Sequence, residues 1–200
     1  MFPLGTVLVP SMVLPLHVFE PRYRVLVERC LAEEHLEFGV VLIERGHEVG
    51  GGDVRTSVGC MARIVAHEAF PDGRYGLVTV GTDRVRVLGW LDDDPYPRAE
   101  VERWLDPEPS KDAAELIGVA ELALRHVLDL AHRHGLGVPP SDVEMSEDPA
   151  LFSHQATALA PVGPLDKLTL LSASTVEERL QRLLDQLEHA RILIEARTSE

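Results

Sequence analysis

Lysine, aromatic residues and positive charge are scarce in this 200-residue sequence, and each scarcity excludes a class of protein. Lys111 and Lys167 are the only lysines, and 19 basic against 33 acidic residues give a net charge of −14. A chain this acidic repels nucleic acids and anionic membranes. Aromatic residues make up 5% of the chain, and no basic stripe interleaves with them as single-strand binding would require. We therefore expect no nucleic-acid partner and no membrane partner.

Cysteine is also rare, and long hydrophobic runs are missing. Cys30 and Cys60 cannot make a disulfide framework, and both occupy apolar-patterned positions where a thiol behaves as a small buried hydrophobe. No run approaches the roughly 18 to 20 apolar residues of a membrane span. The apolar start of the chain has no basic residue before Arg22 and is interrupted by prolines, unlike a signal peptide. The expected location is the cytoplasm.

The motifs of nucleotide-binding and covalent enzymes are absent as well. No Gly-x-x-x-x-Gly-Lys-Ser/Thr occurs, and Gly50-Gly51-Gly52 is followed by Asp53, which would repel a phosphate. There is no Gly-x-Ser-x-Gly elbow, and Lys111 and Lys167 have polar neighbours typical of solvated surface lysines rather than the base of a Ser-Lys dyad. We therefore expect no enzyme, no catalytic residue and no cofactor.

Nine histidines raise the question of a metal site. The densest group is His126, His132 and His134, but separations of six and eight residues do not share a helical face, and no His-Glu-x-x-His occurs. His132 and His134 are better explained as groups that satisfy the last carbonyls of a helix. His17 is either a partly buried residue at a strand end or a surface group. No metal ligand is predicted.

The segment from Leu14 to Tyr23 indicates a strand that turns abruptly into a helix. Apolar residues alternate through Phe19, and a proline within the strand indicates the edge of a sheet. Pro21 then suits a first helical turn, and Glu20 suits the positive end of the helix dipole and stands four residues before Arg24. The helical face that follows consists of Tyr23, Leu26, Val27, Cys30 and Leu31.

The rest of the first half is predicted to be rich in β-strands. Strands are expected at 5–9, 12–19, 37–44, 57–68, 74–81, 83–90 and 98–104. Pro71-Asp72-Gly73 is a strong hairpin turn, and Gly46 to Asp53 is expected to be a flexible loop. Several short strands at close spacing favour a closed or partly closed antiparallel barrel, which removes exposed edges.

After residue 109 the apolar pattern takes the helical period. We expect a long helix capped by Ser110 and ended by Gly135, a second from Asp148-Pro149 to about Ala160, a short one over 165–171, and a last one at the capping box Ser174-Thr175-Val176-Glu177. The sequence thus predicts a β-rich lobe over 1–106 and a helical lobe over 110–200.

Several of these segments together resemble the N-terminal, substrate-binding domain of Lon proteases, over nearly the whole chain. The matching segments are Phe2-Pro3-Leu4, 14–23, Phe38-Gly39-Val40-Val41, 59–64, Pro71-Asp72-Gly73-Arg74, Gly81 with 83–87, 95–101, Leu170-Leu171 and 178–180. The resemblance implies an α+β fold, in which an N-terminal antiparallel β-rich pseudo-barrel (PUA-like) with one inserted helix precedes a C-terminal α-helical bundle. The signature residues, which we expect to serve mainly the fold, are Leu14, Pro15, Leu16, His17, Phe19, Glu20, Pro21, Arg22, Tyr23, Gly39, Asp72, Gly73, Gly81 and Arg84.

The resemblance also implies a non-enzymatic module that binds polypeptide segments or a partner protein, including unfolded or damaged clients, in protein quality control. We expect an apolar groove between the two lobes to take an extended peptide, by strand addition or by side-chain pockets. Side chains that could form such a surface, although packing in the core also explains them, are Met61, Phe70, Leu88, Trp90, Tyr96 and Trp104. Two alternatives stay open: an ATP-independent peptidase or hydrolase with an unrecognised site, and a scaffold or adaptor that self-associates as a homo-oligomer.

Overall fold

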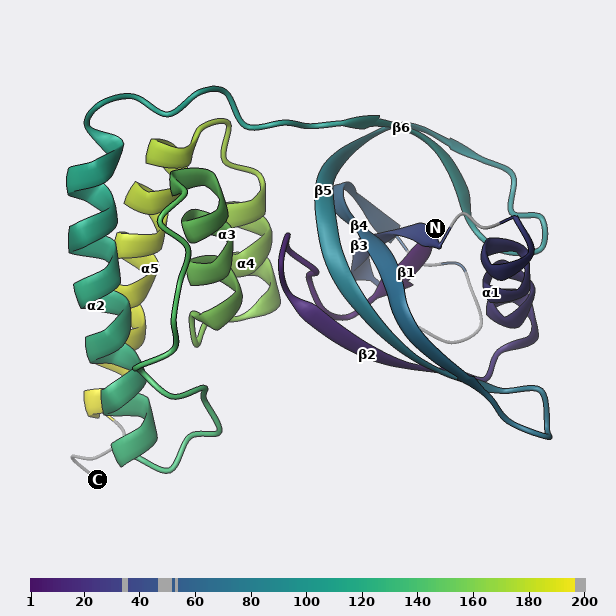
Figure 1. Ribbon diagram of the computed structural model, residues 1–200, viewed down its shortest axis with the longest axis horizontal. Helices are drawn as coiled ribbons and strands as arrows, with labels where there is room; N and C mark the ends of the chain where they lie inside the picture. Colours follow the sequence, from purple (N-terminus) through teal and green to yellow (C-terminus); the bar gives the residue numbers. More distant parts are fainter. Residues whose placement is uncertain (34–35, 47–51, 53, 197–200) are drawn as a thin grey trace. The chain divides into compact units, whose positions relative to one another are not determined.

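The chain folds into two compact units, Met1–Leu105 and Asp106–Glu200 (Figure 1). The computed structural model describes residues 1–33, 36–46, 52 and 54–196. The predicted loop from Gly46 to Asp53 lies mostly outside the described residues. Among the described helices, none is long and apolar enough to cross a membrane.

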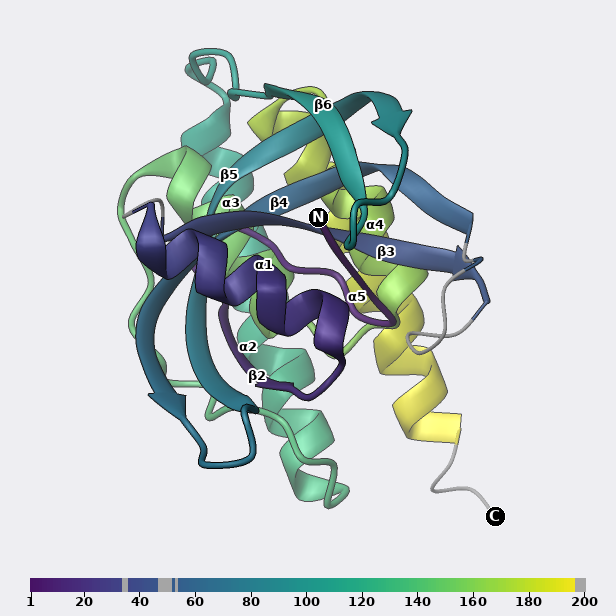
Figure 2. The same cartoon turned by 90° about the vertical axis from the view of Figure 1, so that its right-hand side faces the viewer.

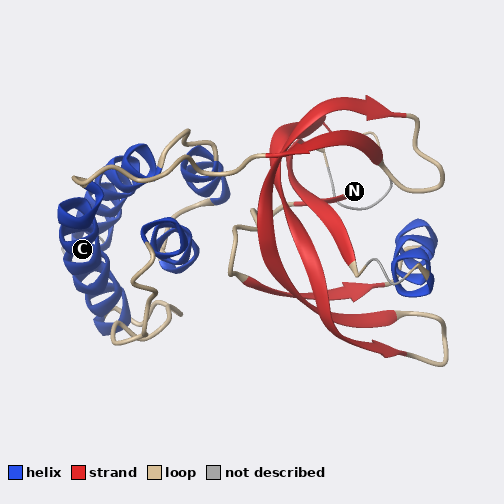
Figure 3. Cartoon of the chain, turned by 45° about the horizontal axis from the view of Figure 1, so that its top comes forward, coloured by secondary structure: helices blue, strands red, loops and turns tan. Residues whose placement is uncertain are grey.

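The first unit is built on one curved sheet, shown in red in Figure 3. Its described strands are β1 (Phe2–Leu4), β2 (Val13–Val18), β3 (Glu37–Arg45), β4 (Val54–Ala69), β5 (Tyr75–Leu91) and β6 (Arg98–Arg103). The strand order is β1-β3-β4-β5-β2, and β6 pairs with a later part of β5. The strands β1 and β2 therefore form opposite ends of this order.

The predicted antiparallel barrel is wrong in its strand directions, because β1 pairs with β3 in parallel and the sheet is mixed. The sequence left a closed and a partly closed barrel open, and the closed form is wrong because β1 and β2 are not neighbours in the strand order. The strand predicted at 5–9 is also wrong, because Val7, Leu8 and Val9 are buried outside any strand and the strand lies earlier, at β1. An apolar run indicates that a segment is buried. It does not by itself show whether that segment is a hydrogen-bonded strand or a buried loop.

β5 is one continuous strand where two were predicted. Gly81, which was expected to end the first of them, pairs with Ala62 within the ladder. A Cβ at Gly81 would lie 2.1 Å from the carbonyl oxygen of Val9, so this glycine permits a close approach of two backbones rather than a break in the strand.

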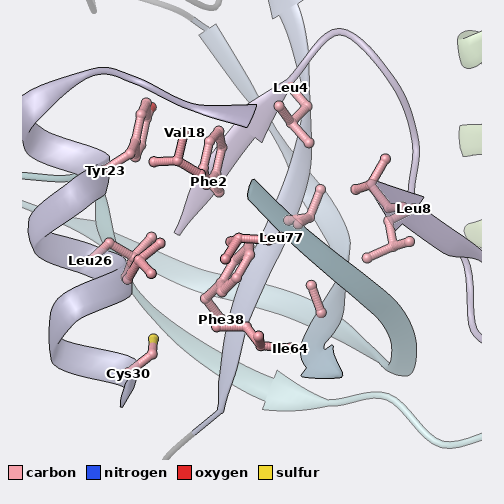
Figure 4. Close-up of a cluster of buried hydrophobic side chains, with 14 of the residues drawn as sticks. Phe2, Leu4, Leu8, Val18, Tyr23, Leu26, Cys30, Phe38, Ile64 and Leu77 are labelled. Carbon is pink, nitrogen blue, oxygen red and sulfur yellow. The ribbon is translucent and has the colours of Figure 1, made fainter. Parts of the chain in front are cut away.

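The helix α1 (Pro21–Ala32) begins at the predicted proline and lies across one end of the sheet (Figure 2). Of the five residues of the predicted face, four are buried and Leu31 is half-buried, and Tyr23 stacks on Phe2 with ring centroids 4.1 Å apart. Figure 4 shows Leu26 and Cys30 directed from α1 toward Phe38 in the core of this unit. The predicted switch from strand to helix at residue 20 is confirmed.

The second unit consists of helices in its described part. They are α2 (Ala113–Arg133), α3 (Pro149–Leu159), α4 (Pro164–Leu171) and α5 (Val176–Ala196). Asp148 caps α3, since its carboxylate accepts a 2.8 Å hydrogen bond from the Leu151 amide. The capping box of α5 lies one residue later than predicted, because Thr175 Oγ1 accepts from the Glu178 amide and Glu178 accepts from the Ser174 amide.

A buried charged cluster in the second unit was not predicted. Arg179 of α5 is fully buried and its guanidinium donates to both carboxylate oxygens of Asp106, at 2.6 and 3.3 Å. The same guanidinium donates to Ser153 Oγ at 2.7 Å, and His154 Nε2 lies 3.0 Å from Asp106 Oδ2. The cluster joins the residue that follows the first unit to α3 and α5.

Candidate functional site

Two adjoining hollows on the first unit form the candidate site. Hollow A encloses about 170 Å³ and is lined by Phe2, Leu4, Pro15, Leu16, His17, Val18, Phe19, Glu20 and Tyr23. Hollow B encloses about 410 Å³ and is lined by Pro15, Leu16, Ala66, His67, Glu68, Gly76, Leu77 and Val78. Because both include Pro15 and Leu16, the two hollows meet at the middle of β2. Apolar side chains form most of both walls.

The alternation of β2 places its side chains on two sides of the sheet. Leu14 and Val18 are buried in the core, whereas Val13, Pro15 and His17 are exposed. β2 pairs only with β5 among the described strands, with Pro15 opposite Val78. Proline has no N–H to offer a further strand, so Pro15 protects this edge from strand addition.

Aromatic side chains border the two hollows. Phe19, in hollow A, is 50% exposed. The His17 ring lies 6.4 Å from the Phe19 ring and 6.0 Å from the Phe70 ring, measured between centroids. Phe70 lies beside Gly76 of hollow B, since a Cβ on Gly76 would lie 3.6 Å from the Phe70 ring, at ordinary van der Waals contact. The aromatic rings thus run from one hollow to the other.

The arginines beside the hollows already have carboxylate partners. Arg22 Nε lies 3.3 Å from Glu20 Oε2, and Arg74 Nε lies 2.6 Å from Asp72 Oδ2. The Arg74 backbone N–H, followed by its side chain, lowers the pKa of the Asp72 carboxyl. Glu68 is exposed and has no ion-pair partner among the described residues. The remaining unpaired charge at the hollows is therefore negative.

The six surface candidates from the sequence do not gather in one place. Phe70 alone lies beside the hollows. Tyr96 is corrected to a core residue, since it is 6% exposed and its hydroxyl accepts a 3.2 Å hydrogen bond from Arg29 Nη1. Met61 is half-buried, 3.8 Å from where a Cβ on Gly39 would lie.

The other three candidates lie elsewhere on the first unit. Leu88 and Trp90 are near the end of β5, and Trp104 follows β6. Leu88 is 63% exposed at a bulge in the β5–β6 ladder. The Trp90 ring is covered by Arg55, whose Cζ lies 4.8 Å from the ring centroid. Arg84 and Arg86 cover Trp104 at 4.4 and 3.6 Å. Guanidinium groups therefore occupy ring faces that we had considered for binding.

Six of the signature residues line hollow A, namely Pro15, Leu16, His17, Phe19, Glu20 and Tyr23. Gly73 has a positive φ of 82° in the turn after β4, and Gly39 leaves room for the Met1 side chain. His17 is a surface group whose Nε2 lies 3.3 Å from Arg74 Nη1. Arg84 is buried against Trp104.

Burial shifts the pKa values of Cys30, Cys60 and Lys167. Burial raises the pKa of the Cys60 thiol to about 12 and also raises that of Cys30. Lys167 is not the solvated residue that we predicted, because its Nζ donates to the Ala158 carbonyl at 2.8 Å and burial lowers its pKa. Among the described residues, no group of three or more His, Cys, Asp or Glu side chains could hold a metal ion.

A third hollow of about 190 Å³ lies in the second unit, where residues 161–166 and 186–194 provide most of its wall. No phenylalanine, tyrosine or tryptophan lines it. The signal for hollows A and B in the sequence was the proline in an otherwise regular strand. The contribution of Val78 could not be foreseen, because its pairing with Pro15 depends on a ladder between distant segments.

Comparisons with known proteins agree with this fold. A Lon protease 2 of Herpetosiphon aurantiacus is 27% identical over 187 residues, which cover 90% of this chain and 22% of that protein. A LON peptidase N-terminal domain and RING finger protein of Schizosaccharomyces pombe is 24% identical over 209 residues, covering 88% of this chain and 42% of that protein. This chain therefore spans less than half the length of these curated relatives.

A solved structure and a family model match most of the chain. The crystal structure of a Lon N-terminal domain protein from Xanthomonas campestris superimposes with a TM-score of 0.65 at 28% identity, covering 92% of this chain and 95% of that one. The model of the ATP-dependent protease La (LON) substrate-binding domain matches residues 1–189. The chain belongs to the family of LON substrate-binding domains.

Proposed function

We propose that this chain is a non-enzymatic module that binds polypeptide clients in cytoplasmic protein quality control, and that hollows A and B of the first unit are its binding site. The observation that carries the proposal is the meeting of two apolar hollows at Pro15 and Leu16 on an exposed strand. Membership of a substrate-binding family supports the same function.

The geometry favours recognition of client side chains over strand addition. A strand added at β2 would meet the ring of Pro15 where a backbone donor is needed. Each hollow can instead take an apolar side chain, and because both hollows include Pro15 and Leu16, the two guests would lie next to each other around the edge strand β2. Unfolded proteins present such side chains, whereas folded proteins bury them.

Size and chemistry of the walls also fit transient binding. Hollow A has the rings of Phe2, Phe19 and Tyr23 in its wall, and hollow B has the exposed aliphatic side chains of Pro15 and Val78. Full burial of one apolar client side chain contributes about 1.5–3 kcal/mol, and two such side chains must offset the entropy of association. We therefore expect weak, rapidly reversible binding of unfolded chains.

The test measures binding of a permanently unfolded, fluorescently labelled protein by anisotropy. Phe19→Ala and Val78→Ser remove exposed parts of hollows A and B. We expect each to weaken binding about five- to tenfold, since each removes about 1–1.4 kcal/mol of apolar contact. Leu122→Ser is the control, because Leu122 is 72% exposed on α2 of the other unit.

Two outcomes would contradict the proposal. One is that the protein neither binds unfolded chains nor delays their aggregation. The other is that Leu122→Ser weakens binding as much as the two variants in the hollows. Incubation with an unfolded substrate, with and without ATP, tests the peptidase alternative, which requires the appearance of fragments.

A further inference from the structure

We propose that the clients of hollows A and B are apolar segments flanked by basic residues, and that Glu68 recognises the flanking cation. This inference rests on the proposed function and concerns which polypeptides the site prefers. It follows from the charges that line the two hollows.

In the described part of the chain, neither hollow has a lysine or an arginine in its wall. The formally charged side chains there are Glu20 in hollow A and Glu68 in hollow B. Glu20 already has a partner in Arg22 at 3.3 Å. Glu68 is exposed at the wall of hollow B and has no such partner among the described residues. A cationic client side chain can therefore pair with Glu68 without displacing an existing ion pair.

The position of Glu68 suits a residue next to a buried apolar one. Glu68 lies opposite Gly76 in the β4–β5 ladder, and Ala66, two residues earlier, lies opposite Val78, so these residues share one face of the sheet. Val78 is 39% exposed and lines hollow B together with Ala66 and Glu68. A client that inserts an apolar side chain against Val78 thus brings a neighbouring residue of its own chain toward the Glu68 carboxylate.

The charge of the whole molecule acts in the same direction. A net charge of −14 attracts cationic chains and repels acidic ones over a distance set by the salt concentration. An exposed ion pair contributes about 0.2–1 kcal/mol, which corresponds to a factor of about 1.4 to 5 in affinity. The expected selectivity is therefore modest and sensitive to salt.

The experiment uses labelled peptides that share one apolar core and differ in their flanks, which are lysine pairs, glutamine pairs or glutamate pairs. Anisotropy gives their affinities for the full chain. We expect the lysine-flanked peptide to bind about two- to fivefold more tightly than the glutamine-flanked one, and the glutamate-flanked peptide to bind most weakly. Salt at about 0.5 M should reduce these differences.

Two variants separate the local pair from the overall charge. Glu68→Gln removes one negative charge at hollow B, and Glu100→Gln removes one exposed negative charge on β6. We expect Glu68→Gln to lose most of the preference for lysine over glutamine, and Glu100→Gln to keep it. Both substitutions are at exposed positions, and circular dichroism will verify the fold.

The outcomes distinguish the two proposals. Equal binding of all three peptides, or equal loss of preference in both variants, would overturn the role of Glu68 while leaving polypeptide binding intact. A failure of every peptide to bind, together with a failure of unfolded proteins to bind, would overturn the proposed function itself.

Discussion

The carboxylate of Asp106 lies 2.6 Å from the fully buried guanidinium of Arg179. A charge taken this far from water is tolerated only with a partner and further hydrogen bonds, which Ser153 and His154 supply, although Arg179 Nε has no hydrogen-bond partner among the described residues. Asp106 is the first residue of the second unit. The pair therefore ties the start of that unit to the helices α3 and α5.

Removing one partner of this pair should destabilise the second unit. We expect Asp106→Asn to lower the free energy of unfolding by about 3–5 kcal/mol, because the Arg179 charge stays buried without its counter-charge. Denaturant titration followed by helical circular dichroism measures the change. Glu108→Gln is the control, since Glu108 is exposed two residues later and loses the same charge. An Asp106→Asn protein as stable as the control would contradict the assignment.

The stacking of Tyr23 on Phe2 makes a prediction about the first unit. Tyr23 is 2% exposed, so Tyr23→Ala removes a large buried side chain and should cost about 3–5 kcal/mol of stability. Thermal unfolding measures the loss. If Tyr23→Ala melts like the unmodified protein and yet loses its client, the residue serves binding more than the fold, against our account.

Two glycines of β5 should differ sharply in their tolerance of alanine. A Cβ at Gly81 would collide with the Val9 carbonyl, whereas nothing lies within 4 Å of a Cβ at Gly89. We expect Gly81→Ala to cost about 1–3 kcal/mol or more through displaced backbone, and Gly89→Ala to cost much less. Chemical denaturation of both variants provides the comparison, and equal stabilities would refute the proposed close contact.

The buried Cys60 thiol predicts a loss of stability at alkaline pH. Burial raises its pKa from 9.0 to about 12, so the folded state holds the proton more tightly than the unfolded state. This contribution is fully present below pH 9 and is lost as pH rises from about 9 toward 12, by up to ~1.4 kcal/mol per pH unit.

Comparison with Cys60→Ala isolates this effect, because other groups also titrate in that range. Stability should fall less steeply with rising pH in the variant, and parallel curves would argue against a buried thiol. In the native protein we also expect both cysteines to react slowly with a thiol reagent at neutral pH, and rapidly after unfolding.

Local patterns in the sequence predicted much of the fold. The change of period at Glu20 and Pro21 located the start of α1, because a proline at the first turn and an apolar face beyond it are local signals. The parallel pairing of β1 with β3 was missed, since pairing partners are set by distant segments. Arg179 was missed although it lies three residues after Val176 and four before Leu183, on the buried face of α5. A charged residue on the buried face of a helix is itself a signal that a residue of opposite charge is buried beside it.

The candidate site could be predicted only in part. Pro15 and Phe19 were recognised as parts of a signature and assigned to the fold, while the structure also places them in the wall of hollow A. Trp90 and Trp104 were considered for binding because aromatic rings in strands can line a groove for another chain, but arginines on neighbouring strands lie over both rings. Such cross-strand coverage depends on the register of the sheet, which no local pattern specifies.

The central claim is that hollows A and B bind unfolded polypeptide, and amide chemical-shift mapping tests it most directly. The labelled protein is titrated with a permanently unfolded client, and shifts are followed residue by residue. Our account predicts that the largest changes fall at residues 13–20, 66–68 and 76–78, around the two hollows. Changes that spare these residues and fall instead around Trp90 and Trp104, or on the second unit, would contradict it.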